Sequence, residues 1–416
     1  MNWLKKKSKQ SNLFISIGGG INQIPLIEEA KKLKMQVIGV DKDICAAGMF
    51  KCDIRIQESI DNYHEIYLKL KELLADGDIT GVLTKSFGPA IKTASYISDK
   101  LNIPMLPYSR VDDFISKEKM KRIFKDNKIN SPGFISFSGN SAHINKKASY
   151  PFVIKPVVGH AKSDVELIKN EKELERYLKS SSSKKDGYLL ENFIKGDEII
   201  AIGIVHQKKF YLAEITDKVK SDPPYFVDIM HISPSKYINL RDTIQEIGQS
   251  VADSFEIVTS PLLMELIVSE DGEIFLIEAA PEFGGEFLSD VLIPRSTGYN
   301  IIREAIKAVT NKNFSPPGNK RKSRNAVIVK YITGTKGTLL SFNPVNSKPG
   351  ILLSRIFKDI GSSIRKPETN HDRIGVIIAT GDTIEEAKDR AENAQMELNI
   401  RIGKKETGKE SAAGQS

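Results

Sequence analysis

The sequence predicts an α/β protein: a doubly wound parallel sheet at the N-terminus, followed by smaller α+β units. Up to about residue 107, short apolar runs alternate with amphipathic stretches, which is the pattern of βαβ units. Between residues 188 and 278, strand-like runs dominate, with one helix-like stretch among them. A chain of 416 residues has room for roughly two to four domains of ordinary size.

The first domain is expected to alternate strands with helices. Apolar runs of strand length and amphipathic runs of helix length follow one another in the order 13–17, 24–33, 37–40, 63–75, 79–84 and 89–100. Pro107 marks the expected end of this doubly wound unit.

The glycine run Gly18 to Gly20 stands between the first strand and the first helix, and two interpretations are open. Glycines here let a backbone approach a pyrophosphate, and Asp41 stands where a ribose-binding acid is expected, so a nicotinamide dinucleotide is one possibility. However, Gln23 occupies the place of the third spaced glycine. The alternative is a tight turn that shapes a substrate cleft.

The remaining elements are predicted by the same periodicities. Helices are expected at 117–130, 171–179, 240–254, 299–309 and 384–398. Strands are expected near Phe134 and at 152–156, and residues 180–185 and 311–323 have the composition of a surface loop and a linker.

Charge and cysteine content narrow the function classes. The chain has 61 basic and 53 acidic side chains, a net charge of +8, and much of the excess lies at the two ends. Aromatic residues do not alternate with the basic ones, so solvated tails are expected and no nucleic-acid partner. No apolar run reaches the ~18 residues of a membrane span, so no membrane partner is expected. Cys45 and Cys52 are too few for a disulfide framework, are expected to be buried, and fit a cytoplasmic protein.

Two lysines are candidates for binding a phosphate. Lys119 lies in the lysine-rich helix, with Pro132 thirteen residues later, and Lys155 lies inside the apolar run Tyr150 to Pro156. A lysine in an apolar strand is costly to bury unless an anion pairs with it, and phosphate is a natural anion for this role. Each lysine taken alone is more often a surface residue, and only the pair together favours a phosphate site.

Acids mark two further features downstream. An apolar strand runs into Glu191, and Glu198 follows seven residues later, a pattern that suits an adenine edge and ribose hydroxyls. Glu265 and Glu278 flank a turn at Asp271-Gly272, so a hairpin would bring their carboxylates together. Paired carboxylates are ligands that Mg²⁺ prefers. Two unrelated surface acids are the alternative.

In this order, these residues resemble the ATP-grasp superfamily, and the carboxylate–amine (amino-acid) ligase branch in particular. The resemblance implies a Rossmann-like N-terminal domain, a small α+β lid, a metal-bearing ATP-grasp domain and an appended subdomain. The expected boundaries are 1–12 for a basic tail, then 13–112, 113–190, 191–312 and 313–402, and 403–416 for a disordered tail. The resemblance also implies that the glycine run forms the first turn of the Rossmann-like domain and does not bind a cofactor.

Roles follow from the same resemblance, residue by residue. The ATP contacts are Lys119, Lys155, Glu191, Asn192, Phe193, Ile194 and Glu198, and the Mg²⁺ ligands are Glu265 and Glu278, with Mn²⁺ as a possible substitute. The residues expected to contact the reacting groups, and so to be catalytic, are Lys155, His160, Lys162 and Arg295. The expected substrate contacts are Lys218, His231, Glu282, Gly284 and Gly285.

Three positions depart from the family pattern. The loop after Lys155 is poorer in glycine than is usual, Ala280 replaces a metal-binding asparagine, and Glu282 replaces a common arginine. Arg295 is the nearest basic residue that could take over the arginine's role.

The implied reaction is ATP-dependent ligation of a small carboxylate to a small amine, through an acylphosphate, with release of ADP and phosphate. Three alternatives stay open: a different acceptor, as in a kinase or carboxylase; a weakly catalytic ATP-binding regulatory protein; and a nicotinamide-linked reductase. The family also suggests a possible homodimer.

Overall fold

The computed structural model of the chain describes residues 12–73, 79–137, 150–159, 162–180, 187–285, 287–318, 325–344 and 348–404. The two expected tails therefore lie almost entirely outside the described residues. Among the helices that are described, none is long and apolar enough to cross a bilayer.

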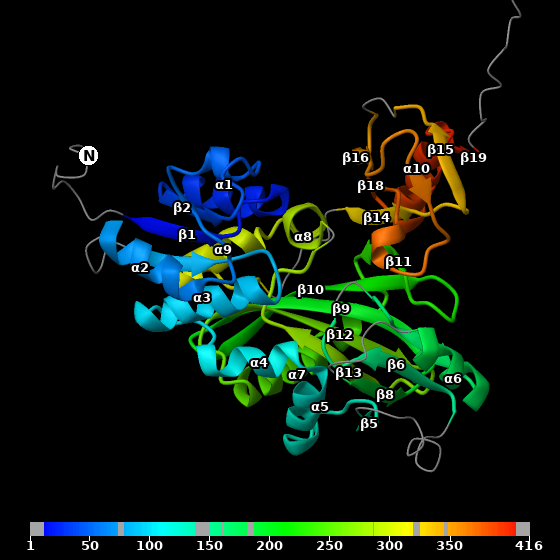
Figure 1. Ribbon diagram of the computed structural model, residues 1–416, viewed down its shortest axis with the longest axis horizontal. Helices are drawn as coiled ribbons and strands as arrows, with labels where there is room; N and C mark the ends of the chain where they lie inside the picture. Colours follow the sequence, from blue (N-terminus) through cyan, green and yellow to red (C-terminus); the bar gives the residue numbers. More distant parts are fainter. Residues whose placement is uncertain are drawn as a thin grey trace, which may run out of the picture.

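The N-terminal domain is a four-stranded parallel sheet in the order β3-β2-β1-β4. Its elements are β1 (Leu13–Ile17), α1 (Ile24–Lys32), β2 (Gln36–Asp41), β3 (Ile54–Gln57), α2 (Tyr63–Leu73), β4 (Ile79–Leu83) and α3 (Pro89–Lys100), with short 3-10 helices η1 (Ile21–Gln23) and η2 (Met49–Lys51). In Figure 1, α1 lies above β1 and β2, whereas α2 and α3 lie below them. The expected alternation is confirmed, and β3 is a strand that the apolar pattern did not predict.

Two helices connect this domain to the lid. After η3 (Tyr108–Arg110), α4 (Val111–Ile115) and α5 (Lys117–Asp126) run as a helical pair. The helix expected over 117–130 ends four residues early, because Lys128 adopts a positive φ of 56°, which no α-helix tolerates.

The described residues of the lid form a four-stranded sheet in the order β5-β8-β6-β7 and one helix. Its elements are β5 (Phe134–Phe137), β6 (Phe152–Pro156), β7 (Glu166–Ile168), α6 (Glu171–Ser180) and β8 (Tyr188–Asn192). A small core of its own, including Phe152, Tyr177 and Leu190, joins helix to sheet.

An eight-stranded sheet in the order β13-β12-β9-β10-β11-β14-β18-β16 forms the centre of the molecule. Its first part comprises β9 (Gly196–His206), β10 (Lys209–Lys220), β11 (Asp228–Ser233), η5 (Ile238–Leu240), α7 (Arg241–Ser254), β12 (Ser260–Ser269), β13 (Ile274–Ala280), η6 (Leu288–Leu292, a π-helix), α8 (Ile293–Thr297) and α9 (Ile301–Val309). The sheet continues without a break into the C-terminal residues, because β11 pairs with β14, with His231 opposite Val329.

Residues 326–403 form the C-terminal subdomain. It comprises β14 (Ala326–Ile332), β15 (Gly337–Ser341), β16 (Ile351–Ile356), β17 (Ser363–Ile364), η7 (Asn370–Asp372), β18 (Gly375–Gly381), α10 (Ile384–Glu397) and β19 (Arg401–Gly403). A second sheet, β17-β15-β19, completes it, and α10 packs on β18 and β14.

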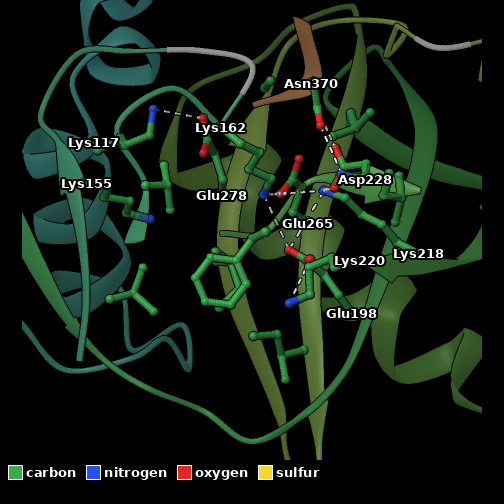
Figure 2. Close-up of a pocket in the computed structure, with 18 of the residues that line it drawn as sticks. Lys117, Lys155, Lys162, Glu198, Lys218, Lys220, Asp228, Glu265, Glu278 and Asn370 are labelled. Atoms are coloured by element: carbon green, nitrogen blue, oxygen red, sulfur yellow. Dashed lines mark hydrogen bonds and ion pairs between the residues drawn. The ribbon is translucent and has the colours of Figure 1, made fainter. Parts of the chain in front are cut away.

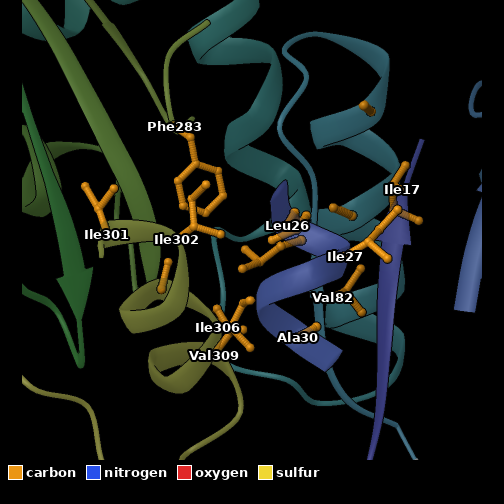
Figure 3. Packing of buried hydrophobic residues seen from close by; sticks show 14 of the residues in the cluster. Ile17, Leu26, Ile27, Ala30, Val82, Phe283, Ile301, Ile302, Ile306 and Val309 are labelled. Atoms are coloured by element: carbon orange, nitrogen blue, oxygen red, sulfur yellow. The ribbon is translucent and has the colours of Figure 1, made fainter. Parts of the chain in front are cut away.

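Helix α9 joins the N-terminal domain to the central sheet. Figure 3 shows Ile302, Ile306 and Val309 of α9 facing Leu26 and Ile27 of α1. The same buried cluster includes Ile200, Ile202 and Ile204 of β9. The Arg303 Nε atom also lies 2.8 Å from the Glu29 Oε2 atom of α1. One continuous core therefore fixes the N-terminal domain against the sheet that carries the site.

Candidate functional site

A cavity of about 310 Å³ lies where the lid, the central sheet and the N-terminal domain meet. Fourteen of the residues predicted from the sequence line it: Lys155, Lys162, Glu191, Asn192, Phe193, Ile194, Glu198, Lys218, His231, Glu265, Glu278, Glu282, Gly284 and Gly285. Figure 2 shows the charged members converging from both walls.

The two predicted metal ligands lie opposite each other in a hairpin. Glu265 of β12 pairs in register with Glu278 of β13, and Gly272 closes the turn with a positive φ of 84°. Paired residues of an antiparallel ladder present their side chains on the same face, so both carboxylates face the cavity. Within the described ranges no group of three potential metal ligands occurs. The donor set is therefore two hard oxygen ligands, which suits Mg²⁺ completed by phosphates and water.

Lysines surround the first of these carboxylates. The Nζ atoms of Lys162 and Lys218 each lie 3.1 Å from Glu265 Oε2, and Lys220 Nζ lies 3.0 Å from Glu198 Oε2. Although burial acts to raise the pKa of Glu198, the ammonium groups around it lower that pKa to about 2. Burial is outweighed in the same way at Glu265, whose pKa lies well below its ordinary value. Both acids are therefore anions at neutral pH. Although burial acts to lower the pKa values of Lys162 and Lys218, these acids raise them, and both lysines are cations.

A second buried cluster lies on the lid side of the cavity. Lys155 Nζ is 2.9 Å and Lys121 Nζ is 3.1 Å from Glu191 Oε1, and all three side chains are at least nine-tenths buried. Burial lowers the pKa of Lys121 to about 8, while attraction to Glu191 opposes that shift. Glu191 thus holds the predicted phosphate lysine, Lys155, in place.

The placement of Lys119 requires a correction. Its side chain is exposed on α5 and does not line the cavity, whereas Lys117 is buried and does. Lys117 Nζ lies 3.4 Å from Glu278 Oε1 and donates to the Gly159 carbonyl at 2.9 Å. The reason is helical periodicity: Lys117 and Lys121 are four residues apart and share the buried face, and Lys119 points about 160° away from it.

Arg295 also lies away from the cavity. It is exposed on α8, because Ile293 and Ser296 take the inward positions of this short helix. The Ser296 hydroxyl belongs to a buried network with Ser233, at 2.9 Å. His160 lies outside the described residues.

The expected substrate residues occupy the floor of the cavity. His231 of β11 is fully buried, and its ring meets that of Tyr331 edge-on at 6.2 Å. Gly284 has a φ of 69°, and a Cβ there would stand 2.7 Å from Leu263 Cδ1. A side chain at this position would therefore be strained and would crowd the floor.

The glycine run is part of a closed turn. Asp41 Oδ2 accepts from the Gly19 amide at 2.8 Å, and its Oδ1 accepts from the Asp43 amide at 2.9 Å. A Cβ on Gly19 would lie 2.5 Å from Met49 Cγ, so side chains already fill the space beside the turn. Asp41 therefore holds the glycine turn in place, which supports a structural role for this run at the start of the fold and not a cofactor-binding one.

The expectation that both cysteines are buried is wrong for Cys45 and met only in part by Cys52. Cys45 is exposed, whereas Cys52 is half-buried. Burial raises the pKa of the Cys52 thiol to about 11.

Comparisons with known proteins agree with this geometry. Residues 148–290 match the ATP-grasp domain model, and residues 330–403 match the model of L-amino acid ligase C-terminal domain 2. The chain is 24% identical over 220 residues to the D-alanine–D-alanine ligase of Sulfurimonas denitrificans, which covers 50% of this chain and 58% of that enzyme. It is 23% identical over 402 residues to the formate-dependent phosphoribosylglycinamide formyltransferase of Sulfurisphaera tokodaii. That alignment covers 91% of this chain and 94% of the formyltransferase.

Among solved structures, the L-amino acid ligase of Bacillus licheniformis superposes with a TM-score of 0.77 at 21% identity, over 95% of this chain and all of that one. This likeness shows the shared fold. Residues 148–290 of the chain form an ATP-grasp domain.

Several residues of this ATP-grasp site were missed from the sequence. Lys117, Lys121, Lys220, Asp228 and Asn370 contact or line the cavity. The two α5 lysines had a signal, because they share the helical face of the buried Met120 and Phe124. Asp228 and Asn370 had none, since they are brought together across 142 residues.

A second cavity of about 330 Å³ adjoins the first, since Phe87 and Gly159 line both. Its walls combine apolar groups such as Tyr63 and Ile115 with the charged side chain of Lys92. The ATP-grasp cavity thus opens toward the N-terminal domain.

Proposed function

We propose that this protein is an ADP-forming carboxylate–amine ligase. The observation that carries the proposal is the paired Glu265 and Glu278 on one face of a hairpin. The ammonium groups of Lys117, Lys162 and Lys218 lie beside these acids, and Lys155 lines the same cavity. Such a set of opposite charges suits a triphosphate with a divalent cation. The match of residues 330–403 to a C-terminal domain of L-amino acid ligases supports amino acids as substrates.

In this proposal the adenine and ribose lie beside residues 191–194 and Glu198, and the lysines hold the phosphates. Glu265 and Glu278 would hold Mg²⁺ (or Mn²⁺), which when bound neutralises charge on the phosphates. A substrate carboxylate oxygen attacks the γ-phosphorus and ADP leaves. The amine nitrogen then attacks the acyl carbon and phosphate leaves, so the protein supplies positioning and charge but no nucleophile.

We place one of the two small-molecule substrates in the second cavity and the reacting groups near Gly159, which the two cavities share. Lys162 is the phosphate-side candidate for contact with the reacting groups, and His231 lines the floor beneath them. A cytoplasmic location and the absence of a nucleic-acid partner are part of the same proposal.

An ADP-release screen tests the proposal. Small carboxylates and amines are supplied singly and in pairs with Mg²⁺-ATP, and amino acids, which carry both groups, are supplied alone and in pairs. We expect ADP only where both a carboxylate and an amine are present. Glu278→Gln should abolish this release, and Glu273→Gln, at an exposed position of the same hairpin, should not.

Other outcomes would contradict the proposal. A phosphorylated product from one substrate indicates a kinase, and dependence on bicarbonate indicates a carboxylase. ATP binding without turnover across the panel indicates a regulatory protein, as Ala280 and Glu282 in the cavity would favour.

A further inference from the structure

The C-terminal subdomain reaches the main cavity through Asn370, which is its one contribution among the described lining residues. Asn370 begins η7, whose turn is held by a capping box between Thr369 and Asp372. Arg373 Nε donates to the Asn370 carbonyl at 2.8 Å. The backbone that presents this amide is therefore fixed from both sides.

Asn370 binds one acid in two ways. Its Nδ2 donates to Asp228 Oδ2 at 2.7 Å, and its Oδ1 accepts from the Asp228 backbone amide at 2.9 Å. Asp228 is 4% exposed. Two contacts in opposite directions fix both the orientation of the amide and the rotamer of the carboxylate.

The other oxygen of Asp228 faces the nucleotide site. Asp228 Oδ1 lies 3.3 Å from Lys218 Nζ, and Lys218 Nζ lies 3.1 Å from Glu265 Oε2 (Figure 2). Lys218 is 4% exposed, so its charge must be balanced by the acids that surround it. Glu198 Oε1 lies farther off, 3.8 Å from the same nitrogen. The ammonium is thus shared mainly between Asp228 and Glu265, the proposed metal ligand.

We propose that Asn370 is a positioning residue for the metal–nucleotide site, acting through Asp228 and Lys218. With Asp228 held in place, Lys218 divides its charge among Asp228, Glu265 and the more distant Glu198, and leaves Glu265 available to a divalent cation. When Asp228 is not held in place, the buried ammonium of Lys218 pairs more closely with Glu265 and competes with the divalent cation for it. This inference rests on the proposed role of Glu265.

Calorimetric titration with the ATP analogue AMP-PNP, with and without Mg²⁺, tests this inference on the full chain. In Asn370→Ala we expect affinity in the presence of Mg²⁺ to fall roughly tenfold, the equivalent of one charge-assisted hydrogen bond. Affinity without Mg²⁺ should stay unchanged. Asn393→Ala, at an exposed position on α10, is the matched control and should leave both affinities unchanged.

An exchange of the two side chains distinguishes a role of Asn370 in positioning Asp228 against Lys218 from a role in holding the C-terminal subdomain in place. Asp228→Asn combined with Asn370→Asp keeps an amide–carboxylate pair between the subdomains but removes the negative charge from Lys218. We expect it to melt no lower than Asp228→Asn alone, because the amide–carboxylate pair is kept, and still to lose the Mg²⁺-dependent affinity. Recovery of that affinity in the swap would overturn the inference.

Non-additivity provides a second test. Because both residues act on Lys218, Asn370→Ala should add no further loss in an Asp228→Asn background, and independent losses would refute the chain of contacts. All of these measurements are of binding, so they test the inference even if the unsubstituted protein releases no ADP. A parent whose AMP-PNP affinity ignores Mg²⁺ would reject the metal site and this inference together. If Mg²⁺ increases AMP-PNP affinity equally in the parent and in Asn370→Ala, the inference is rejected and the metal site is not.

Discussion

Lys117 and Lys119 offer a matched test of the nucleotide site, because they are the same residue type on the same helix. Lys117 is buried, 3.4 Å from Glu278, and Lys119 is exposed. We expect Lys117→Met to weaken Mg²⁺-ATP binding and Lys119→Met to leave it unchanged. Methionine keeps most of the apolar stem, so the substitution removes the charge with little loss of packing.

The expected size follows from the geometry. At an effective dielectric constant of about 20, two unit charges 3.4 Å apart attract by about 5 kcal/mol before desolvation is subtracted. A hydrogen bond to a charged group retains about 1.5–3 kcal/mol of net stabilisation. If Lys117 exchanges Glu278 for a phosphate of similar distance, its removal raises the dissociation constant by about 10- to 150-fold.

A fluorescence titration with a labelled ATP analogue at fixed Mg²⁺ measures these constants, and thermal melting verifies that each variant is folded. Equal losses in the two variants, or a larger loss at Lys119, would refute the assignment of the phosphate contact to the buried face of α5.

Two further predictions concern the N-terminal domain. Cys45 should react with a thiol reagent at pH 8 well before Cys52: the Cys52 thiol, with its pKa raised by burial to about 11, carries roughly 100-fold less thiolate than a thiol with the ordinary value of 9.0. Cys45→Ser should remove the fast phase, and a remaining fast phase would contradict this. Asp41→Ala should destabilise the domain by about 1–3 kcal/mol, since the Gly19 amide loses its acceptor. The same variant should leave ATP binding intact, and NAD binding by the parent would contradict the assigned role of Asp41.

Features set by local periodicity could be predicted from the sequence. The apolar runs on either side of Asp271-Gly272 require a hairpin, and the hairpin register then places Glu265 opposite Glu278. The burial of Lys155 was also predictable, because its strand is apolar. The sequence predicted a phosphate as the paired anion, and in the structure the carboxylate of Glu191 lies 2.9 Å from Lys155 Nζ.

The α5 error shows where residue type alone misleads. Three lysines stand at alternate positions of one helix, and only the phase of the apolar residues separates them. Met120 and Phe124 are buried, so Lys117 and Lys121 share their face and Lys119 does not. The information was present in the helical period, which a motif match to a single lysine does not use.

Asn370 and Asp228 lay beyond prediction because their contact depends on the assembled sheet. Pairing of β11 with β14 attaches the C-terminal subdomain to the same sheet that carries the Glu265–Glu278 hairpin at its other edge. Moving that subdomain away from the site requires breaking ladder pairs such as His231 with Val329, so its position is fixed by backbone hydrogen bonds. An amide presented from this fixed position can hold a buried carboxylate in one rotamer. The strands form from local patterns, but this contact arises only after residues 142 positions apart have been joined through the ladder.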